Sequence, residues 1–134
     1  MSHKNETPSP RPDLNGLLVQ QPGNAAVYLM FNGAACWIPD PTVLFRLFSP
    51  VNITQLDLSE VARGATLSEG SVVIRNSATG QIAFFTNGQK HYVPNPTVLQ
   101  EYSFANWIEL WPEIYDAIPA GADVQARTPI PAAV

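Results

Sequence analysis

The sequence predicts an α+β fold, rich in β-strands, in which two tandem repeats of about 55 residues pack with pseudo-twofold symmetry. The first observation is internal repetition, because residues 27–44 return as residues 82–99 with Asn32, Pro39 and Leu44 matched 55 positions later. The second is an Asn-Gly pair between two apolar runs in each copy. The third is a content of 13 Pro and 8 Gly in 134 residues, which is typical of many short elements joined by turns.

Each repeat begins with a predicted strand and hairpin. Residues 16–20 form a short apolar run that a turn containing Pro-Gly closes. Residues 27–31 are rich in β-branched and aromatic side chains, and Asn32-Gly33 then suits a two-residue turn that needs two positive φ angles. The return strand is expected at 34–38. The corresponding elements of the second copy are a strand at 70–75, hairpin strands at 82–86 and 89–93, and a turn at Asn87-Gly88.

A short helix should follow each hairpin. Pro39 ends the return strand because it lacks the N–H that a strand ladder requires. Asp40 and Asn95 are good N-cap residues, and the proline after each of them suits the first helical position. Apolar side chains at helical spacing come next, and we expect them to be buried in one shared core. They are Val43, Leu44, Leu47 and Phe48 in the first copy and Val98, Leu99 and Tyr102 in the second.

A short strand and a second short helix complete each predicted repeat. Asp57 and Glu60 have the spacing of a capping box, and Pro112 marks a helix start in the second copy. The offset between the copies grows from 55 to 57 before residue 61, so the second copy carries two extra residues there. The strands are expected at 53–56 and 108–111.

The two repeats are expected to form one domain, because an isolated hairpin with one helix is marginally stable in water. The polar, proline-rich N-terminus cannot bury enough apolar surface to order itself. The predicted boundaries are a flexible tail at 1–13, the first repeat at 14–66, the second repeat at 67–125, and a flexible tail at 126–134.

Composition and charge exclude several classes of partner. The net charge of -4 argues against nucleic acid, because few cations are present to displace counterions from phosphates. No apolar run approaches the roughly 20 residues of a membrane span. Residues 1–13 lack the apolar centre of a signal peptide, so a cytoplasmic location is the default expectation, with non-classical export as the alternative.

Catalytic arrangements are also disfavoured, and we expect no enzymatic activity, no cofactor and no metal ion. A nucleophilic pair would need Cys36 beside His91, which occupies the equivalent position of the second repeat, but a lone Cys is more often a buried structural residue. These two residues are too few for a zinc site, which wants three or four ligands. Neither a Gly-x-Ser-x-Gly elbow nor a phosphate-binding Gly-rich loop is present. Glu109, Glu113 and Asp116 crowd near a helix start, where they suit the helix dipole.

Aromatic and short polar side chains near the hairpin returns indicate a binding site for a neutral polyhydroxylated ligand. An aromatic ring covers the C–H face of a sugar while amide or carboxylate groups select its hydroxyls. The competing interpretation is that these residues only make turns, caps and core. The candidate ligand-binding residues are Asn32, Trp37, Asp40, Asn87, His91, Tyr92 and Asn95.

The repeated pattern also resembles a known type of sequence. A strand ending in Asn-Gly, an aromatic residue, Ile or Val followed by Pro-Asp-Pro or Pro-Asn-Pro, and a later Ile-Pro-x-Gly resemble the short repeats of a two-repeat family of uncharacterised bacterial proteins. The resemblance covers most of residues 14–124, and it implies a tandem-repeat architecture without implying an activity. Members often carry Lys-Arg where this chain has residues 34–36 or 89–91.

The sequence therefore favours a non-catalytic, lectin-like binding module with one equivalent carbohydrate site per repeat. The alternative is a protein–protein interaction or structural module, as part of a toxin or envelope assembly. A homodimer is expected as well, because residues 27–38 carry no charge in twelve consecutive positions and would form a bare strand edge. Cover of this edge by the second repeat is the competing expectation.

Overall fold

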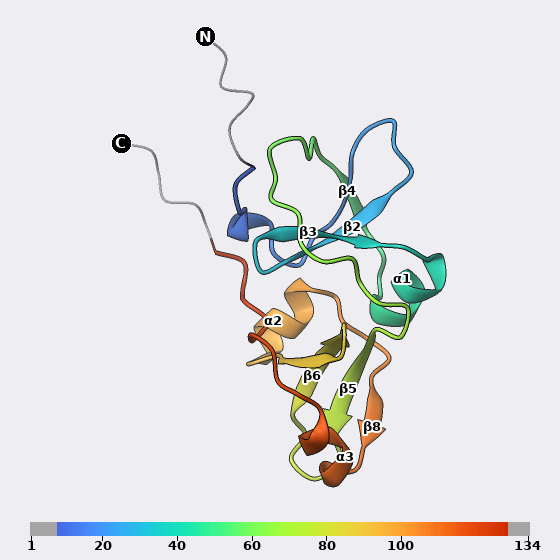
Figure 1. Ribbon diagram of the computed structural model, residues 1–134, viewed down its shortest axis with the longest axis vertical. Coiled ribbons are helices and arrows are strands. Elements are labelled where there is room, and N and C mark those ends of the chain that lie inside the picture. The colour runs from blue at the N-terminus through green and yellow to red at the C-terminus, as the bar shows by residue number, and fades with distance from the viewer. Residues whose placement is uncertain (1–7, 129–134) are drawn as a thin grey trace.

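The computed structural model describes residues 8–128, which form two four-stranded β-sheets of the same topology and three short α-helices (Figure 1). Sheet 1 has the strand order β3-β2-β1-β4, with β1 (Leu18–Gln20), β2 (Val27–Phe31), β3 (Ala34–Ile38) and β4 (Ile53–Gln55). Sheet 2 has the order β7-β6-β5-β8, with β5 (Val72–Asn76), β6 (Ile82–Thr86), β7 (Gln89–Tyr92) and β8 (Ile108–Leu110). A mixed, strand-rich α+β fold is therefore confirmed.

Both Asn-Gly hairpins form as the sequence predicts. Asn32 and Asn87 have φ angles of 51° and 52°, and the glycine after each also has positive φ. Phe31 then pairs with Ala34, and Thr86 pairs with Gln89, so each loop has two residues. A two-residue loop with positive φ at both positions matches the right-handed twist of the strands.

The helices after the hairpins begin at the predicted caps. Helix α1 (Pro41–Leu47) starts where Asp40 Oδ1 accepts a hydrogen bond of 2.7 Å from Thr42 N–H. Helix α2 (Pro96–Glu101) starts where Asn95 Oδ1 accepts one of 3.0 Å from Val98 N–H. Each helix lies on the crossover that lets the next strand join the sheet in parallel, β4 beside β1 and β8 beside β5.

The predicted second helix forms only in the C-terminal half, as α3 (Pro112–Ala117). The prediction of a helix after Asp57 is wrong. The chain makes only a turn there, in which Asp57 Oδ1 accepts a hydrogen bond of 3.0 Å from Ser59 N–H. Leu58 and Val61 must both reach the buried face of sheet 1 within this short segment, before Ala62 pairs with β3. The two extra residues of the C-terminal half give α3 the length that the first half lacks.

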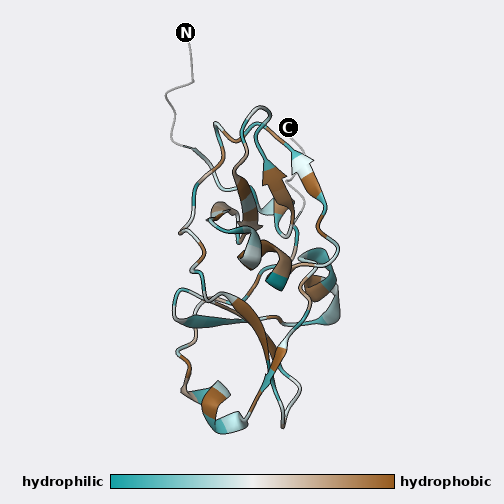
Figure 2. Cartoon of the chain, turned by 90° about the vertical axis from the view of Figure 1, so that its right-hand side faces the viewer, coloured by the Kyte–Doolittle hydropathy of each residue, from teal (hydrophilic) through white to brown (hydrophobic). Residues whose placement is uncertain are grey.

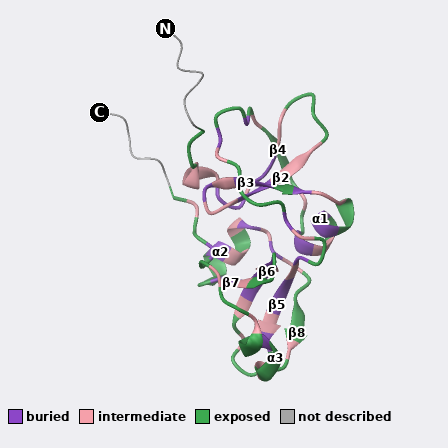
Figure 3. Cartoon of the chain, viewed as in Figure 1, coloured by how far each residue is buried: buried purple, intermediate pink, exposed green. Residues whose placement is uncertain are grey.

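The main core lies between the two sheets and takes side chains from both. Val43, Leu47, Val98 and Tyr102 belong to one buried cluster, with Leu99 packed against it, so the predicted shared core is confirmed. Successive strand residues alternate between faces, and smaller clusters bury the opposite face of each sheet. Figure 2 shows the apolar character of the strands, and Figure 3 shows buried residues on the central strands of each sheet and on parts of α1 and α2, while β8 and α3 are largely exposed.

The outer edge of β3 is covered by the chain itself. Ala35 N–H donates to Ala62 O (2.8 Å), and Leu67 N–H donates to Trp37 O (3.0 Å). The segment at 119–124 covers β7 in the same way, with Val124 N–H donating to Tyr92 O at 2.9 Å. The β3 edge is therefore paired, by residues 62–67 and not by the body of the second repeat, so it supplies no reason for a homodimer.

Part of each predicted tail packs against the fold. Ser9 N–H donates to Glu60 O (3.0 Å), and Thr128 N–H donates to Pro12 O (3.0 Å), beside the short 3-10 helix η1 (Pro12–Leu14). Residues 1–7 and 129–134, which complete the predicted tails, lie outside the described residues. None of the helices between residues 8 and 128 has the length and apolar character that a bilayer crossing requires.

Candidate functional site

Two surface grooves lie at corresponding positions, where the return strand of each hairpin leads into a helix. The first groove has a volume of about 340 Å³ and the second about 210 Å³. Each of the nine residues that line the first groove lies 55 positions before one that lines the second. The first groove is lined by Ala25, Ala26, Val27, Trp37, Ile38, Pro39, Asp40, Pro41 and Leu44. The second is lined by Gly80, Gln81, Ile82, Tyr92, Val93, Pro94, Asn95, Pro96 and Leu99.

The local sequence explains how each groove forms. In the first groove, Val27 and Ile38 are paired across the hairpin and supply apolar side chains. Pro39 ends strand pairing, and the capped helix start at Asp40 then turns the chain so that Leu44 faces the same groove. The groove is therefore a consequence of the strand–Pro–cap–Pro order that both halves share.

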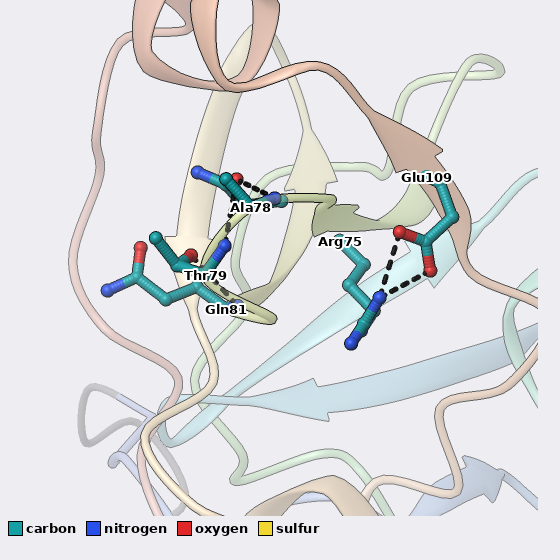
Figure 4. Close-up of polar contacts among 6 residues, drawn as sticks. Arg75, Ala78, Thr79, Gln81 and Glu109 are labelled. Atoms are coloured by element: carbon teal, nitrogen blue, oxygen red, sulfur yellow. Dashed lines mark hydrogen bonds and ion pairs between the residues drawn. The ribbon is translucent and has the colours of Figure 1, made fainter.

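A tight turn before each hairpin forms the remaining wall. In the second half, Asn76 Oδ1 accepts hydrogen bonds from Ala78 N–H (2.9 Å) and Thr79 N–H (3.3 Å), and Thr79 Oγ1 accepts one from Gln81 N–H (3.2 Å) (Figure 4). In the first half, Asn24 Oδ1 accepts from Ala26 N–H at 2.9 Å. These side-chain bonds hold both walls in place without any ligand.

Each groove combines an aromatic ring with one short polar side chain. Trp37 is 42% exposed, and Tyr92 occupies the same position in half-buried form. Asp40 and Asn95 each use one oxygen as the helix cap, while Asp40 Oδ2 and Asn95 Nδ2 make no hydrogen bond with any residue from 8 to 128. The first groove thus offers a free hydrogen-bond acceptor, and the second offers a free donor.

Asn32 and Asn87 lie at the hairpin tips and have other partners. Asn32 Nδ2 donates to Asp123 O (2.9 Å), and its Oδ1 accepts from Gln125 N–H (2.8 Å). Asn87 Nδ2 donates to Thr66 O at 3.0 Å. Each tip therefore fastens a covering segment that comes from the other half of the chain. Figure 1 shows the red C-terminal segment running from α3 past α2.

His91 lies with these two asparagines in a separate cavity of about 270 Å³ between the hairpins, which we call the central cavity. His91 is buried, its Nδ1 lies 2.7 Å from Ala122 O, and its ring packs edge-on against Phe31 at 5.0 Å between centroids. Cys36 also lines the central cavity. Burial raises the pKa of the Cys36 thiol to about 11, so the nucleophilic thiolate does not form at neutral pH.

The structure thus divides the seven predicted ligand-binding residues between three places. Trp37 and Asp40 meet in the first groove, and Tyr92 and Asn95 meet in the second. Asn32, Asn87 and His91 line the central cavity instead. Sequence reasoning missed the turn residues of the groove walls, Ala25, Ala26, Gly80 and Gln81, although their shared offset from each hairpin was a signal that could have found them.

Between residues 8 and 128 no group of three or more His, Cys, Asp or Glu side chains is placed to hold a metal ion. Comparisons with family models, with curated proteins and with solved structures found no match to the chain.

Proposed function

We propose that the chain is a tandem repeat with pseudo-twofold symmetry, akin to the bacterial repeat proteins that its sequence resembles, and that it is a non-catalytic binding module for a neutral carbohydrate. Each groove takes one sugar unit. The observation that carries the proposal is the residue-by-residue correspondence of the two groove linings. A ring plus one unpaired polar atom is the combination that recognises the apolar face and one hydroxyl of a sugar.

Size and charge support a small neutral ligand. Volumes of about 340 and 210 Å³ fall at or below the lower end of the roughly 300–1,000 Å³ of drug-sized ligand sites. Neither groove is lined by Lys or Arg, so an anionic ligand would find no counter-charge. Each site alone is weak, and a ligand that spans both gains affinity because its second contact is intramolecular.

The test is a glycan array with wild-type protein, followed by titration of the best ligand against three variants. We expect Trp37→Ala and Tyr92→Ala each to lower affinity about tenfold, equivalent to about 1.4 kcal/mol. Trp107→Ala is the matched control, because Trp107 is 41% exposed and lies outside both grooves. Equal losses in all three variants, or no glycan bound above background, would refute the proposal.

The second candidate is a protein–protein interaction or structural module of a toxin or envelope assembly. One observation favours it, since large apolar side chains are exposed at β8 and α3. A cytoplasmic location, with non-classical export as the alternative, remains part of the proposal. A homodimer also remains a proposal, although the pairing of the β3 edge removes the bare strand edge that was the reason to expect it.

A further inference from the structure

The outer edge of β8 is the open edge of sheet 2. This strand pairs with β5 on one side, and no strand between residues 8 and 128 pairs with its other side. The opposite edge of the sheet, at β7, is covered by the segment at 119–124. An open strand edge presents a row of backbone N–H and C=O groups that another extended chain can pair with.

Large apolar side chains gather beside this edge. Among residues 8–128, four of the seven exposed large apolar residues lie within residues 107–114, and they include Trp111 at 71% and Ile108 at 50% exposure. We call Trp107, Ile108, Trp111 and Ile114 the β8 patch. Figure 3 shows β8 and α3 as the exposed end of sheet 2. Exposed residues gathered in this way mark interaction sites, whereas single ones do not.

The patch lies along the edge and at its C-terminal end. Ile108 and Leu110 point to the face that α3 covers, because Leu110 packs against the cluster that contains Ile74 and Tyr115. Trp111 follows β8 directly as the N-cap residue of α3 and is the most exposed member of the patch. A strand added at this edge would therefore find apolar side chains on the α3 face and at the end of β8.

The charge around the edge is negative. Glu109 is at the centre of β8, and Glu113 and Asp116 lie exposed on α3. Arg75 Nη1 donates to both carboxylate oxygens of Glu109 at 2.9 and 2.7 Å, so this pair is neutral and the uncompensated negative charges beside the edge are Glu113 and Asp116 (Figure 4). Lys90 Nζ donates to Tyr115 O at 2.6 Å and lies over the Tyr115 ring. The complementary partner is cationic.

A second copy of this chain fits the edge poorly. Antiparallel pairing of two β8 strands about their central residue would set the Arg75–Glu109 ion pair of one copy opposite that of the other, an arrangement that supplies no attraction between the copies. Both copies would also bring the acidic residues of α3 to the same interface.

The other half of the chain supplies an internal comparison. β4 is the corresponding edge strand of sheet 1, and it shares an exposed isoleucine, Ile53 in place of Ile108. The residues that correspond to Trp107, Glu109 and Trp111 are Asn52, Thr54 and Leu56. The aromatic and acidic features are therefore specific to β8 and are not part of how the sheet is built.

From these observations we infer that the β8 edge binds an extended peptide segment, with alternating apolar side chains and at least one Lys or Arg, which adds a strand to sheet 2. The added backbone hydrogen bonds hold the segment, the β8 patch takes its apolar side chains, and the carboxylates of Glu113 and Asp116 select its cation. This surface is separate from the two grooves, so the inference stands without the proposed carbohydrate function.

The probe is a short synthetic peptide of alternating Val and Lys, titrated into the full chain and followed by amide NMR shifts. We expect saturable shifts centred on β8 and α3. The same peptide with Glu in place of Lys should not bind, and a version with a central Pro should bind at least tenfold more weakly because strand pairing is blocked. Saturable binding of the Glu peptide, or shifts centred on β4, would overturn the inference.

Two variants locate the contact, and each has a counterpart on β4. Trp111→Ala and Glu109→Lys should each weaken binding about tenfold, whereas the matched controls Leu56→Ala and Thr54→Lys should leave it unchanged. Thermal melts of all four variants check that the fold is intact. Equal affinity in wild type and both β8 variants, or a wild-type dimer that Trp111→Ala converts to monomer, would overturn the inference.

Discussion

At the scale of single residues, Asn and Asp side chains have different structural roles at different positions. Asp40 and Asn95 each combine a helix cap with an unpaired polar atom in a groove. Asn32 instead uses both its amide nitrogen and its amide oxygen to hold the C-terminal segment, and Asn87 uses its amide nitrogen and its backbone N–H to hold residues 66 and 68. A groove residue is therefore identified by where its unpaired polar atom lies, which the residue type alone does not reveal.

The caps at Asp40 and Asn95 can be separated from ligand binding by substitution. We expect Asp40→Ala and Asn95→Ala each to lower the free energy of unfolding by about 1 kcal/mol, because the first turn loses its side-chain acceptor. Asp40→Asn keeps that acceptor, so its stability should match wild type while ligand preference in the first groove changes. Urea midpoints measure the stability. An unchanged midpoint for both alanine variants would contradict the capping role.

We call the two hydrogen bonds of the Asn32 side chain to residues 123 and 125 the Asn32 clamp, and substitution can separate this clamp from the hairpin turn. Asn32→Gly keeps the positive φ but loses both hydrogen bonds to residues 123 and 125. We therefore expect its free energy of unfolding to fall by about 1 kcal/mol. Asn32→Ala should lose more, because alanine is strained at φ 51°. Urea denaturation of wild type and the two variants measures these differences in the free energy of unfolding. A glycine variant as stable as wild type would show that the clamp contributes nothing.

Burial of Cys36 should appear in the pH dependence of stability. Its pKa rises from 9.0 to about 11 on folding, so between these values the folded state holds a proton that the unfolded state has released. The free energy of unfolding is therefore expected to fall as pH rises from about 9 towards 11. Cys36→Ala should flatten the decline between pH 9 and 10, below the range where the raised pKa of buried Tyr102 begins to act. Urea melts across this range test it, and identical slopes for variant and wild type would contradict it.

At the scale of elements, the covering segments depend on two glycines at corresponding positions. A Cβ at Gly121 would lie 2.4 Å from His91 Cε1, and one at Gly64 would lie 2.6 Å from Cys36 Sγ. These segments close the outer edges of β7 and β3 by backbone hydrogen bonds, so they cannot move away without exposing an edge.

Gly64→Ala and Gly121→Ala should therefore each destabilise the fold by about 1–3 kcal/mol, the usual range for overpacking. Gly70→Ala is the control, because a Cβ at Gly70 meets nothing within 4 Å. Thermal unfolding of the three variants compares them. If Gly121→Ala melts at the same temperature as Gly70→Ala, the segment at 119–124 tolerates displacement and the close packing described above is unimportant.

At the scale of the whole molecule, the two halves share contacts that neither could replace alone. Phe31 of sheet 1 meets Phe84 of sheet 2 edge-on at 5.3 Å between ring centroids. Ala105 N–H donates to Leu47 O (2.9 Å), and Arg46 Nη1 donates to the carbonyls of Glu69 and Ser71. The main core is therefore formed by side chains of both halves packed against each other.

Residues 67–134 expressed alone should consequently fail to fold. Without residues 8–66, the inner faces of sheet 2 and α2 lose the partners of Phe84, Val98 and Phe104 in the shared cluster. We expect no cooperative thermal transition and poorly dispersed amide NMR shifts, with the full chain as the control. A cooperative melt of this half would show that its own outer cluster, around Ile74 and Tyr115, is enough.

The sequence by itself determined the features that depend on neighbouring residues. Positive φ at Asn-Gly, a cap at Asp40 or Asn95, and the proline that begins each helix are local choices with local causes, and they allowed the hairpins, α1 and α2 to be predicted. These local features also bring an aromatic residue and a cap residue together in each groove, because Trp37 and Asp40, like Tyr92 and Asn95, are only three positions apart in the chain.

Only the tertiary structure decided what depends on distant residues. The capping-box spacing at Asp57 predicted a helix, but the need to bury Leu58 and Val61 and to return to β3 within a few residues left a turn. Asn32 was separated from the grooves because its amide binds residues 123 and 125, about ninety positions away in the chain. Likewise, the edge at β3 is covered because residues 62–67 return along it with backbone hydrogen bonds, whereas no strand among residues 8–128 pairs with the outer edge of β8.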